Sequence, residues 1–135
     1  MSRRGGSLTG LWAGVYAYPN GLAPPVAFTA WLLEHGGALS GHTSEPNSFG
    51  GVRALTLIAD LAGGRSAAAV SFTKTYRGLV ADRIRYSGAL SADMARIEGR
   101  WTIAGPTTMQ GSFVMIRSDA GRAKHRIAVK EEVAS

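Results

Sequence analysis

The stretch IEGRWTIAGP, residues 97–106, alternates between two kinds of side chain. One side of an extended chain receives the apolar and small residues, Ile97, Gly99, Trp101 and Ile103. The other side receives the polar residues, Glu98, Arg100 and Thr102. A period of two is typical of a β-strand that buries one face and exposes the other. We therefore expect a strand here, with Trp101 facing inward and the charged residues on the outer surface.

The same pattern recurs along the chain, and each time a short cluster of Gly, Ser, Asn, Asp or Pro follows it. Helical periodicity is almost absent. The eight predicted strands are residues 8–18, 26–34, 38–44, 52–61, 67–76, 83–90, 95–103 and 111–117. A parallel pairing needs a crossover of about a dozen residues or more, so connections this short join antiparallel neighbours. The sequence thus predicts an all-β meander.

Glycines stand between large aromatic residues on the predicted inner faces, as at Gly14 between Trp12 and Tyr16, and at Gly88 beside Tyr86. A glycine inside a strand marks a bend or a close approach. This favours closure of the sheet over two stacked sheets. We predict an eight-stranded antiparallel up-and-down β-barrel, whose interior is filled by side chains or holds one small ligand.

Length and composition indicate one globular domain, with 135 residues, 45% hydrophobic and 18% charged. We expect a flexible N-terminus over residues 1–7, the barrel over 8–117, and a helical or disordered tail over 118–135. The absence of cysteine excludes disulfides, thiolate metal sites and a cysteine nucleophile. No apolar run follows Arg3 and Arg4, which predicts a cytoplasmic protein without a signal peptide or membrane anchor.

The net charge of +6 is distributed along the chain. The first arginine pair supplies two positive charges and the last eighteen residues supply one. The remaining excess of three lies between residues 8 and 117, where nine basic residues face six acidic ones. So mild an excess raises non-specific affinity for polyanions, and we do not expect specific nucleic-acid binding.

Several short motifs resemble those of the calycins, the superfamily of avidins, lipocalins and fatty-acid-binding proteins. GLW at residues 10–12 resembles the Gly-x-Trp of the first calycin strand, whose Trp packs against an Arg near the end of the last strand; Trp12 and Arg117 occupy those places. The avidin and streptavidin branch is the most similar. Its strand motifs correspond to GALSG (37–41), FTKTY (72–76), YSG (86–88) and IEGRW (97–101).

The resemblance does not extend to the biotin site of the avidins. Gly14 replaces a polar Asn of that site, and Phe113 stands where an Asp contacts biotin. Phe72 and Tyr86 replace two of the tryptophans that stack on biotin, and only Trp101 matches. What the resemblance implies is therefore a calycin barrel that does not bind biotin.

The predicted interior combines aromatic walls with polar tips, which is the usual form of a small-molecule site. The candidate ligand-binding residues are Tyr16, Tyr18, Phe72, Lys74, Tyr76, Tyr86, Trp101 and Phe113. The first hypothesis is a barrel that binds a small, partly apolar ligand. Two alternatives stay open: a small isomerase or cyclase that uses Lys74 or a tyrosine as acid or base, and a filled barrel with a structural or oligomerisation role. The sequence identifies no catalytic residue, metal ligand or cofactor.

Two features have competing interpretations. Lys74 interrupts an aromatic face, and we expect it near the rim with its ammonium reaching water, although ligand binding is the alternative. His42 precedes Glu45 by three residues, and the two could share a metal only with further ligands, so we expect a surface histidine. The loop over residues 45–51, with two glycines at its end, is either a lid over the pocket or a plain hairpin loop.

Two predicted strands are apolar on both faces, namely residues 26–33 and 55–61. A strand buried on one side only should alternate with polar residues. We therefore predict that the outer barrel surface forms a subunit interface and that the protein is a homo-oligomer, with a dimer favoured.

Overall fold

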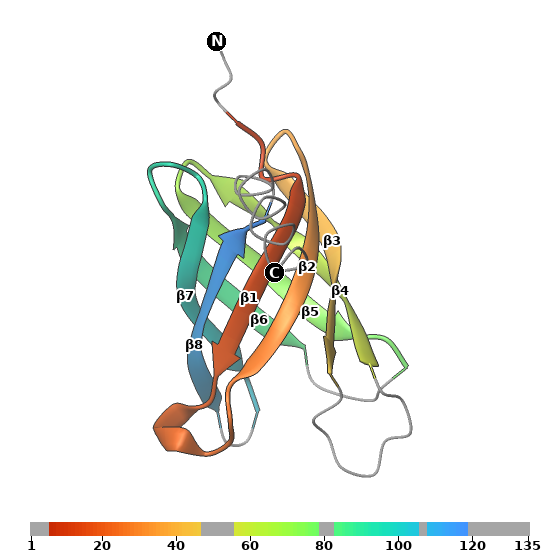
Figure 1. Cartoon of the computed structure of the whole chain (residues 1–135), viewed down its shortest axis with the longest axis vertical. Helices are drawn as coiled ribbons and strands as arrows, with labels where there is room; N and C mark the ends of the chain where they lie inside the picture. Colours follow the sequence, from red (N-terminus) through yellow and green to blue (C-terminus); the bar gives the residue numbers. More distant parts are fainter. Residues whose placement is uncertain (1–5, 47–55, 79–82, 106–107, 119–135) are drawn as a thin grey trace, which may run out of the picture.

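The computed structural model describes residues 6–46, 56–78, 83–105 and 108–118, which form a closed antiparallel barrel (Figure 1). Each strand pairs with its neighbours in the chain, and β1 also pairs with β8. The strands are β1 (Gly10–Ala17), β2 (Val26–His35), β3 (Ala38–Pro46), β4 (Thr56–Ser66), β5 (Ala69–Tyr76), β6 (Ile84–Leu90), β7 (Arg96–Ile103) and β8 (Met109–Arg117). One short 3-10 turn, η1 (Pro19–Gly21), follows β1. The predicted eight-stranded up-and-down barrel is confirmed.

The predicted turn between β4 and β5 is wrong. The predicted strands 52–61 and 67–76 left AGGRS, residues 62–66, as the turn between them, but β4 continues through these residues to Ser66. The reversal comes at Ala67, which has a positive φ of 54°. Gly63 lies within the strand, and a Cβ there would lie 2.1 Å from the carbonyl oxygen of Ser71 on β5, so a larger residue would not fit. This glycine allows a close approach between strands instead of a turn.

Three other strands are also longer than predicted, β2 by one residue only, to His35. β3 continues beyond Ser44 to Pro46, and β8 begins at Met109 instead of residue 111. The extension of β3 places Glu45 inside the barrel wall instead of in a loop.

Along each strand, successive side chains alternate between the inner and outer sides of the barrel wall, as predicted for residues 97–103. Trp101 is buried, whereas Glu98 and Arg100 on the same strand are exposed. Close packing inside depends on Gly14, where an added Cβ would lie 2.3 Å from Cζ of Phe28. The aromatic ring on β2 therefore occupies the space that a side chain on β1 would need.

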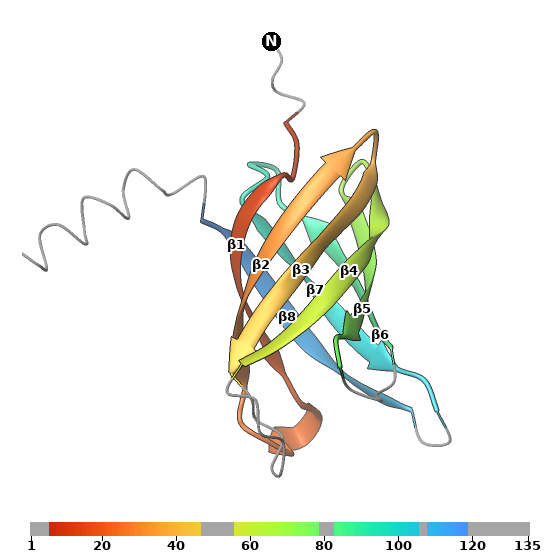
Figure 2. The same ribbon diagram turned by 90° about the vertical axis from the view of Figure 1, so that its right-hand side faces the viewer.

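The capped end of the barrel, the upper end in Figures 1 and 2, is closed by residues 6–9. Leu8 and Trp12 are fully buried there, and the Trp12 indole N–H donates a hydrogen bond to the Leu8 carbonyl at 3.0 Å. The guanidinium of Arg117 lies 5.0 Å from the Trp12 ring centroid and donates hydrogen bonds to the carbonyls of Ser7 and Thr9. These contacts join the first and last strands.

Parts of the predictions lie outside the described residues. These are most of the predicted N-terminal segment (1–5), most of the 45–51 loop (47–51), the start of the predicted strand 52–61 (52–55), and almost all of the tail (119–135) with its histidine. In the described part of the chain, no helix has the length and apolarity needed to cross a membrane.

Candidate functional site

Most of the predicted site residues lie toward the barrel end that carries η1, which is the lower end in Figure 2. Seven of the eight are buried, and Tyr18 is half-buried. They divide into three groups by position. Five line a pocket at the barrel end, Phe72 and Phe113 pack further inside the barrel, and Lys74 is enclosed in the wall.

The end pocket is a cavity of about 230 Å³ with a mainly aromatic wall. Its lining residues are Tyr16, Tyr18, Tyr76, Ile84, Tyr86, Trp101 and Ile103. Three of the rings meet edge to face: Tyr18 lies 5.6 Å from Trp101 and 5.8 Å from Tyr16, with interplanar angles of 79° and 69°. Aromatic pairs prefer this geometry, so the walls of the end pocket hold one another in place.

Trp101 is fixed in the wall by two features. Its indole N–H donates a hydrogen bond to the Ala17 carbonyl at 3.0 Å, so this donor is already used. Beside it, a Cβ on Gly111 would lie 2.6 Å from the indole ring, which means that glycine makes room for the tryptophan. Trp101 therefore offers an apolar surface to the end pocket.

Between the end pocket and the capped end, the barrel interior is filled with aromatic rings. Phe72 stacks on Tyr86 with a centroid distance of 5.0 Å and an interplanar angle of 13°. Phe113 meets the same tyrosine edge to face at 4.9 Å. Phe72 and Phe113 are thus the floor under the site and do not line the cavity. The usable space is at the end of the barrel rather than along its axis.

Lys74 does not reach water, so the expectation that it lies near the rim is wrong. Its side chain is only 1% exposed, and its ammonium lies 2.7 Å from Oε1 of Glu45, whose side chain is 0% exposed. The ammonium also lies close to ring centroids on three sides, 4.7 Å from Tyr16, 4.8 Å from Tyr76 and 5.4 Å from Phe28. Buried charge is tolerated here because an ion pair and aromatic ring faces replace water.

Glu45 is the centre of this network, and the sequence analysis missed it. Its Oε2 accepts hydrogen bonds from the hydroxyls of Tyr16 at 2.7 Å and Tyr76 at 3.0 Å, while Oε1 accepts one from Lys74. The signal was present, since Leu39, Thr43 and Glu45 continue one period-two face of β3. The predicted strand ended one residue too early to include it.

Burial controls the titration of the groups around Glu45. It raises the pKa of the Tyr16 and Tyr76 phenols above their usual value, and the hydrogen-bonded contact with Glu45 raises both further. Burial also raises the pKa of Tyr86. For Lys74, burial lowers the pKa while the Glu45 carboxylate opposes that change. At neutral pH the tyrosines are therefore protonated donors, and none of them is a base.

Thr43 contributes a further polar atom to the interior. It is 1% exposed, and its hydroxyl has no hydrogen-bond partner among the residues that the structure describes. An unpaired buried hydroxyl costs stability. The Thr43 hydroxyl therefore differs from the Glu45 carboxylate nearby in the chain, whose two oxygens both accept hydrogen bonds.

The structure removes one possible metal site. His42 is exposed on the outer side of β3, whereas Glu45 is buried on the inner side, so the two side chains cannot share an ion. His35 is also exposed. Within the described ranges, no group of three or more His, Asp or Glu side chains is arranged to hold a metal ion.

Comparison with known proteins does not extend this description. No protein-family model matches the chain, and no curated protein matches its sequence. The closed eight-stranded antiparallel barrel is consistent with a calycin-like fold.

Proposed function

We propose that the protein binds a small, partly apolar molecule in the end pocket. The observation that carries the proposal is a cavity of about 230 Å³ with an aromatic wall. Two of its tyrosines, Tyr16 and Tyr76, donate hydrogen bonds to the buried carboxylate of Glu45. An apolar cavity with a few convergent polar groups is the usual form of a small-molecule site. The volume lies below the range of roughly 300–1,000 Å³ found for drug-sized ligands, which favours a smaller molecule.

The hydrogen bonds suggest what the ligand carries. Tyr16 and Tyr76 donate their hydroxyl protons to Glu45, which leaves lone pairs on both phenolic oxygens as acceptors. The Trp101 N–H is used by Ala17 and donates nothing to the pocket. A compact hydrocarbon body with one hydroxyl or amine donor matches this arrangement.

Binding is favoured over the catalytic alternative because the candidate acid and base groups already bind one another. Lys74 and the hydroxyls of Tyr16 and Tyr76 all contact Glu45, and the Lys74 ammonium and Glu45 carboxylate do not line the cavity. A group that acts on a substrate must lie within hydrogen-bond reach of it. An isomerase or cyclase would need this network to open first.

The proposal includes the avidin and streptavidin branch as the most similar calycin group, without its biotin chemistry. Gly14 occupies the position of the avidin Asn, and the Phe28 ring leaves no room there for a longer side chain. Phe113 packs on Tyr86 where a biotin-contacting Asp is expected. The ligand is therefore expected to differ from biotin.

Titration calorimetry with cyclohexanol and methylcyclohexane tests the proposal. The two probes share shape and size, but only the alcohol carries a donor for the tyrosine oxygens. We expect cyclohexanol to bind with a Kd of about 1 mM or tighter and methylcyclohexane at least about tenfold more weakly. Native mass spectrometry of protein from its own host should show any retained ligand as added mass.

The control is a matched pair of variants. Ile103→Trp fills the end pocket, whereas Ile58→Trp makes the same change on the outer side of β4. We expect the first to abolish cyclohexanol binding and the second to leave it unchanged. Equal binding by both variants, or no binding by the wild type together with no retained mass, would contradict the proposal and favour a filled structural barrel.

A further inference from the structure

The outer surface of β8, β1 and β2 is apolar over most of its length. We call it the apolar face; its residues are Ala13, Val15, Ala27, Thr29, Trp31, Leu33, Val114 and Ile116. Four large side chains on it are substantially exposed: Val15 by 40%, Ile116 by 44%, Trp31 by 46% and Leu33 by 50%. No Asp, Glu, Lys or Arg stands among the residues of this face. An exposed apolar patch of this kind marks an interaction site.

The outer surface of the other strands is different. The outer positions of β6 and β7 carry exposed charged residues, among them Arg85, Arg96, Glu98 and Arg100. On β4, which β5 separates from β6, exposed Asp60 pairs with Arg77 at 2.7 Å. The predicted apolar outer surface of residues 55–61 therefore does not extend across β4, whereas that of residues 26–33 forms the centre of the apolar face.

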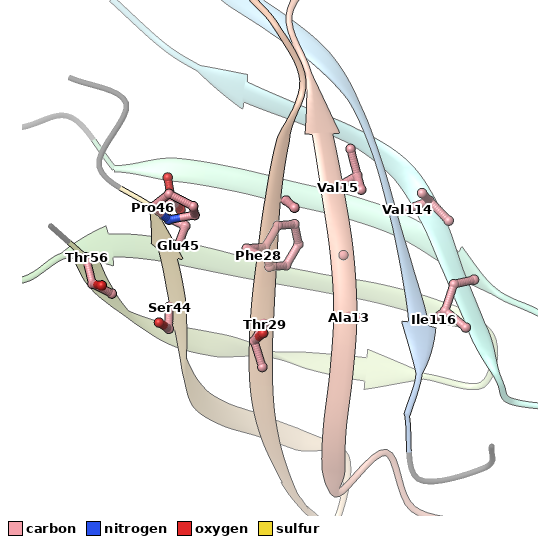
Figure 3. A pocket seen from close by; sticks show the side chains of 12 residues that line it. Ala13, Val15, Phe28, Thr29, Ser44, Glu45, Pro46, Thr56, Val114 and Ile116 are labelled. Carbon is pink, nitrogen blue, oxygen red and sulfur yellow. The ribbon is translucent and has the colours of Figure 1, made fainter. Parts of the chain in front are cut away.

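A hollow of about 720 Å³ lies on the apolar face (Figure 3). Figure 3 shows its walls coming from β8, β1, β2, β3 and β4. The outward side chains around it are mostly short, including Ala13, Ala27, Thr29 and Ser44. Glu45 also lines it, but its carboxylate is fully buried and bound to Lys74, so the hollow remains uncharged.

Trp31 lies beside this hollow on the same face. It follows Thr29, a wall residue, by two positions on β2, which places it about 7 Å further along the strand. A large, half-exposed indole and a hollow lined by short side chains are thus neighbours on one surface. A two-fold axis between them brings each indole opposite the hollow of the other copy.

We propose that two copies of this chain form a symmetric dimer through the apolar face, with Trp31 of each copy seated in the hollow of the other. In a two-fold interface the same patch meets itself, so any charged residue near the axis would face its own copy. The apolar face avoids that repulsion because it is uncharged. Association through the arginine-bearing side would instead bring like charges together.

The size of the face is compatible with a dimer. The apolar face and the hollow together extend over four adjacent strands, β8, β1, β2 and β3. At a strand spacing of about 4.8 Å and with about eight residues of about 3.3 Å each, they give a projected area of roughly 500 Å². Accessible surface exceeds its projection when side chains protrude, and a standard interface buries about 800 Å² on each partner. Trp is also the residue type most often found as the energetic centre of an interface.

Sedimentation equilibrium of the full chain tests this inference, and it needs no ligand. We expect the wild type to be dimeric at 100 µM, and Trp31→Lys to raise the dimer dissociation constant at least ~30-fold. Ala27→Trp, which fills the hollow without adding charge, should also weaken the dimer. The matched control is Leu22→Lys, because Leu22 is 67% exposed in the β1–β2 connection, outside the apolar face.

The three substituted positions, Leu22, Ala27 and Trp31, are all on the surface, so the variants are expected to retain the melting temperature of the folded monomer within a few degrees. A monomeric wild type at 100 µM would overturn the inference. So would a dimer that Leu22→Lys weakens as much as Trp31→Lys, or one that Ala27→Trp leaves intact. If Trp31→Lys loses the dimer but still binds cyclohexanol, the dimer and the proposed ligand binding are independent, so either can fail without the other.

Discussion

The two ends of the barrel interior solve the same packing problem with different chemistry. At the capped end, Leu8, Trp12, Ile97 and Met115 are all 0% exposed and entirely apolar apart from one indole N–H, which is hydrogen-bonded. At the pocket end, the interior holds a carboxylate, an ammonium and several phenols around a cavity.

The difference shows where stability and function separate. Apolar packing stabilises by about 25 cal/mol for each Å² removed from water, without directional demands. A buried ion pair costs desolvation that its own attraction barely offsets, and replacing it with apolar residues is often neutral or stabilising. Stability alone therefore accounts for the capped end but not for the polar groups at the pocket end, which is why we propose ligand binding there.

The largest expected effect comes from Glu45→Leu. It leaves the Lys74 ammonium unpaired in the interior and removes the acceptor of two tyrosine hydroxyls, so unfolding should become easier by at least about 3–5 kcal/mol. The double variant Glu45→Leu with Lys74→Met should be more stable than Glu45→Leu alone. Urea unfolding of the single and double variants measures this, and additive losses would contradict the pairing.

Met115→Ala tests the capped end. Removing a fully buried apolar side chain should cost about 2–5 kcal/mol through lost burial and a residual cavity. This change leaves no buried charge without its partner. A second substitution should therefore not restore the lost stability in the way that Lys74→Met does for Glu45→Leu. Urea unfolding measures the loss of stability, and we expect the folded variant to bind cyclohexanol as tightly as the wild type does. Lost binding would mean that packing at the capped end controls the end pocket.

Thr43→Val has the opposite sign. The change keeps the shape of the side chain and removes a hydroxyl that has no partner in the described part of the chain, so the free energy of unfolding should rise by about 1 kcal/mol. Thermal unfolding compares this variant with Thr43→Ala, which removes volume as well and should destabilise. A destabilised Thr43→Val would show that the hydroxyl has a bound partner in solution.

The smallest effect at neutral pH concerns the tyrosines, and it grows under alkaline conditions. Because the folded state raises the pKa of Tyr16, Tyr76 and Tyr86, it holds their protons more tightly than the unfolded chain does. Their contribution to stability is complete below about pH 10, the ordinary tyrosine pKa, and is lost as the pH rises above it.

Ultraviolet absorbance at alkaline pH tests this, with circular dichroism to follow folding. We expect three of the four tyrosines to ionise only as the barrel unfolds. In urea all four should titrate near pH 10. Reversible ionisation of all four in the folded protein would show that water reaches the Glu45 network.

The sequence predicted much of the fold because strand alternation is a local property. Ile97 and Trp101 face inward and Glu98 and Arg100 outward, since successive side chains of a strand point to opposite sides whatever lies across from them. The same rule placed the candidate site residues inside. The errors came at strand ends, where Gly63 and Gly64 resemble a turn but serve a close strand contact.

Partnership between distant residues was beyond the sequence. Lys74 and Glu45 are 29 positions apart, and neither residue's neighbours show that the two meet. Lys74 therefore looked like a rim residue and Glu45 like part of a loop.

By itself, then, the sequence determined an eight-stranded antiparallel barrel, its inner and outer faces, and the aromatic character of its interior. Only the tertiary structure decided that the barrel is filled along most of its axis, that one end holds a small cavity, and that a buried carboxylate organises the polar groups beside it. The physical reason is range: periodicity fixes which way each side chain points, but packing volume and the pairing of buried charges depend on which strands closure brings face to face.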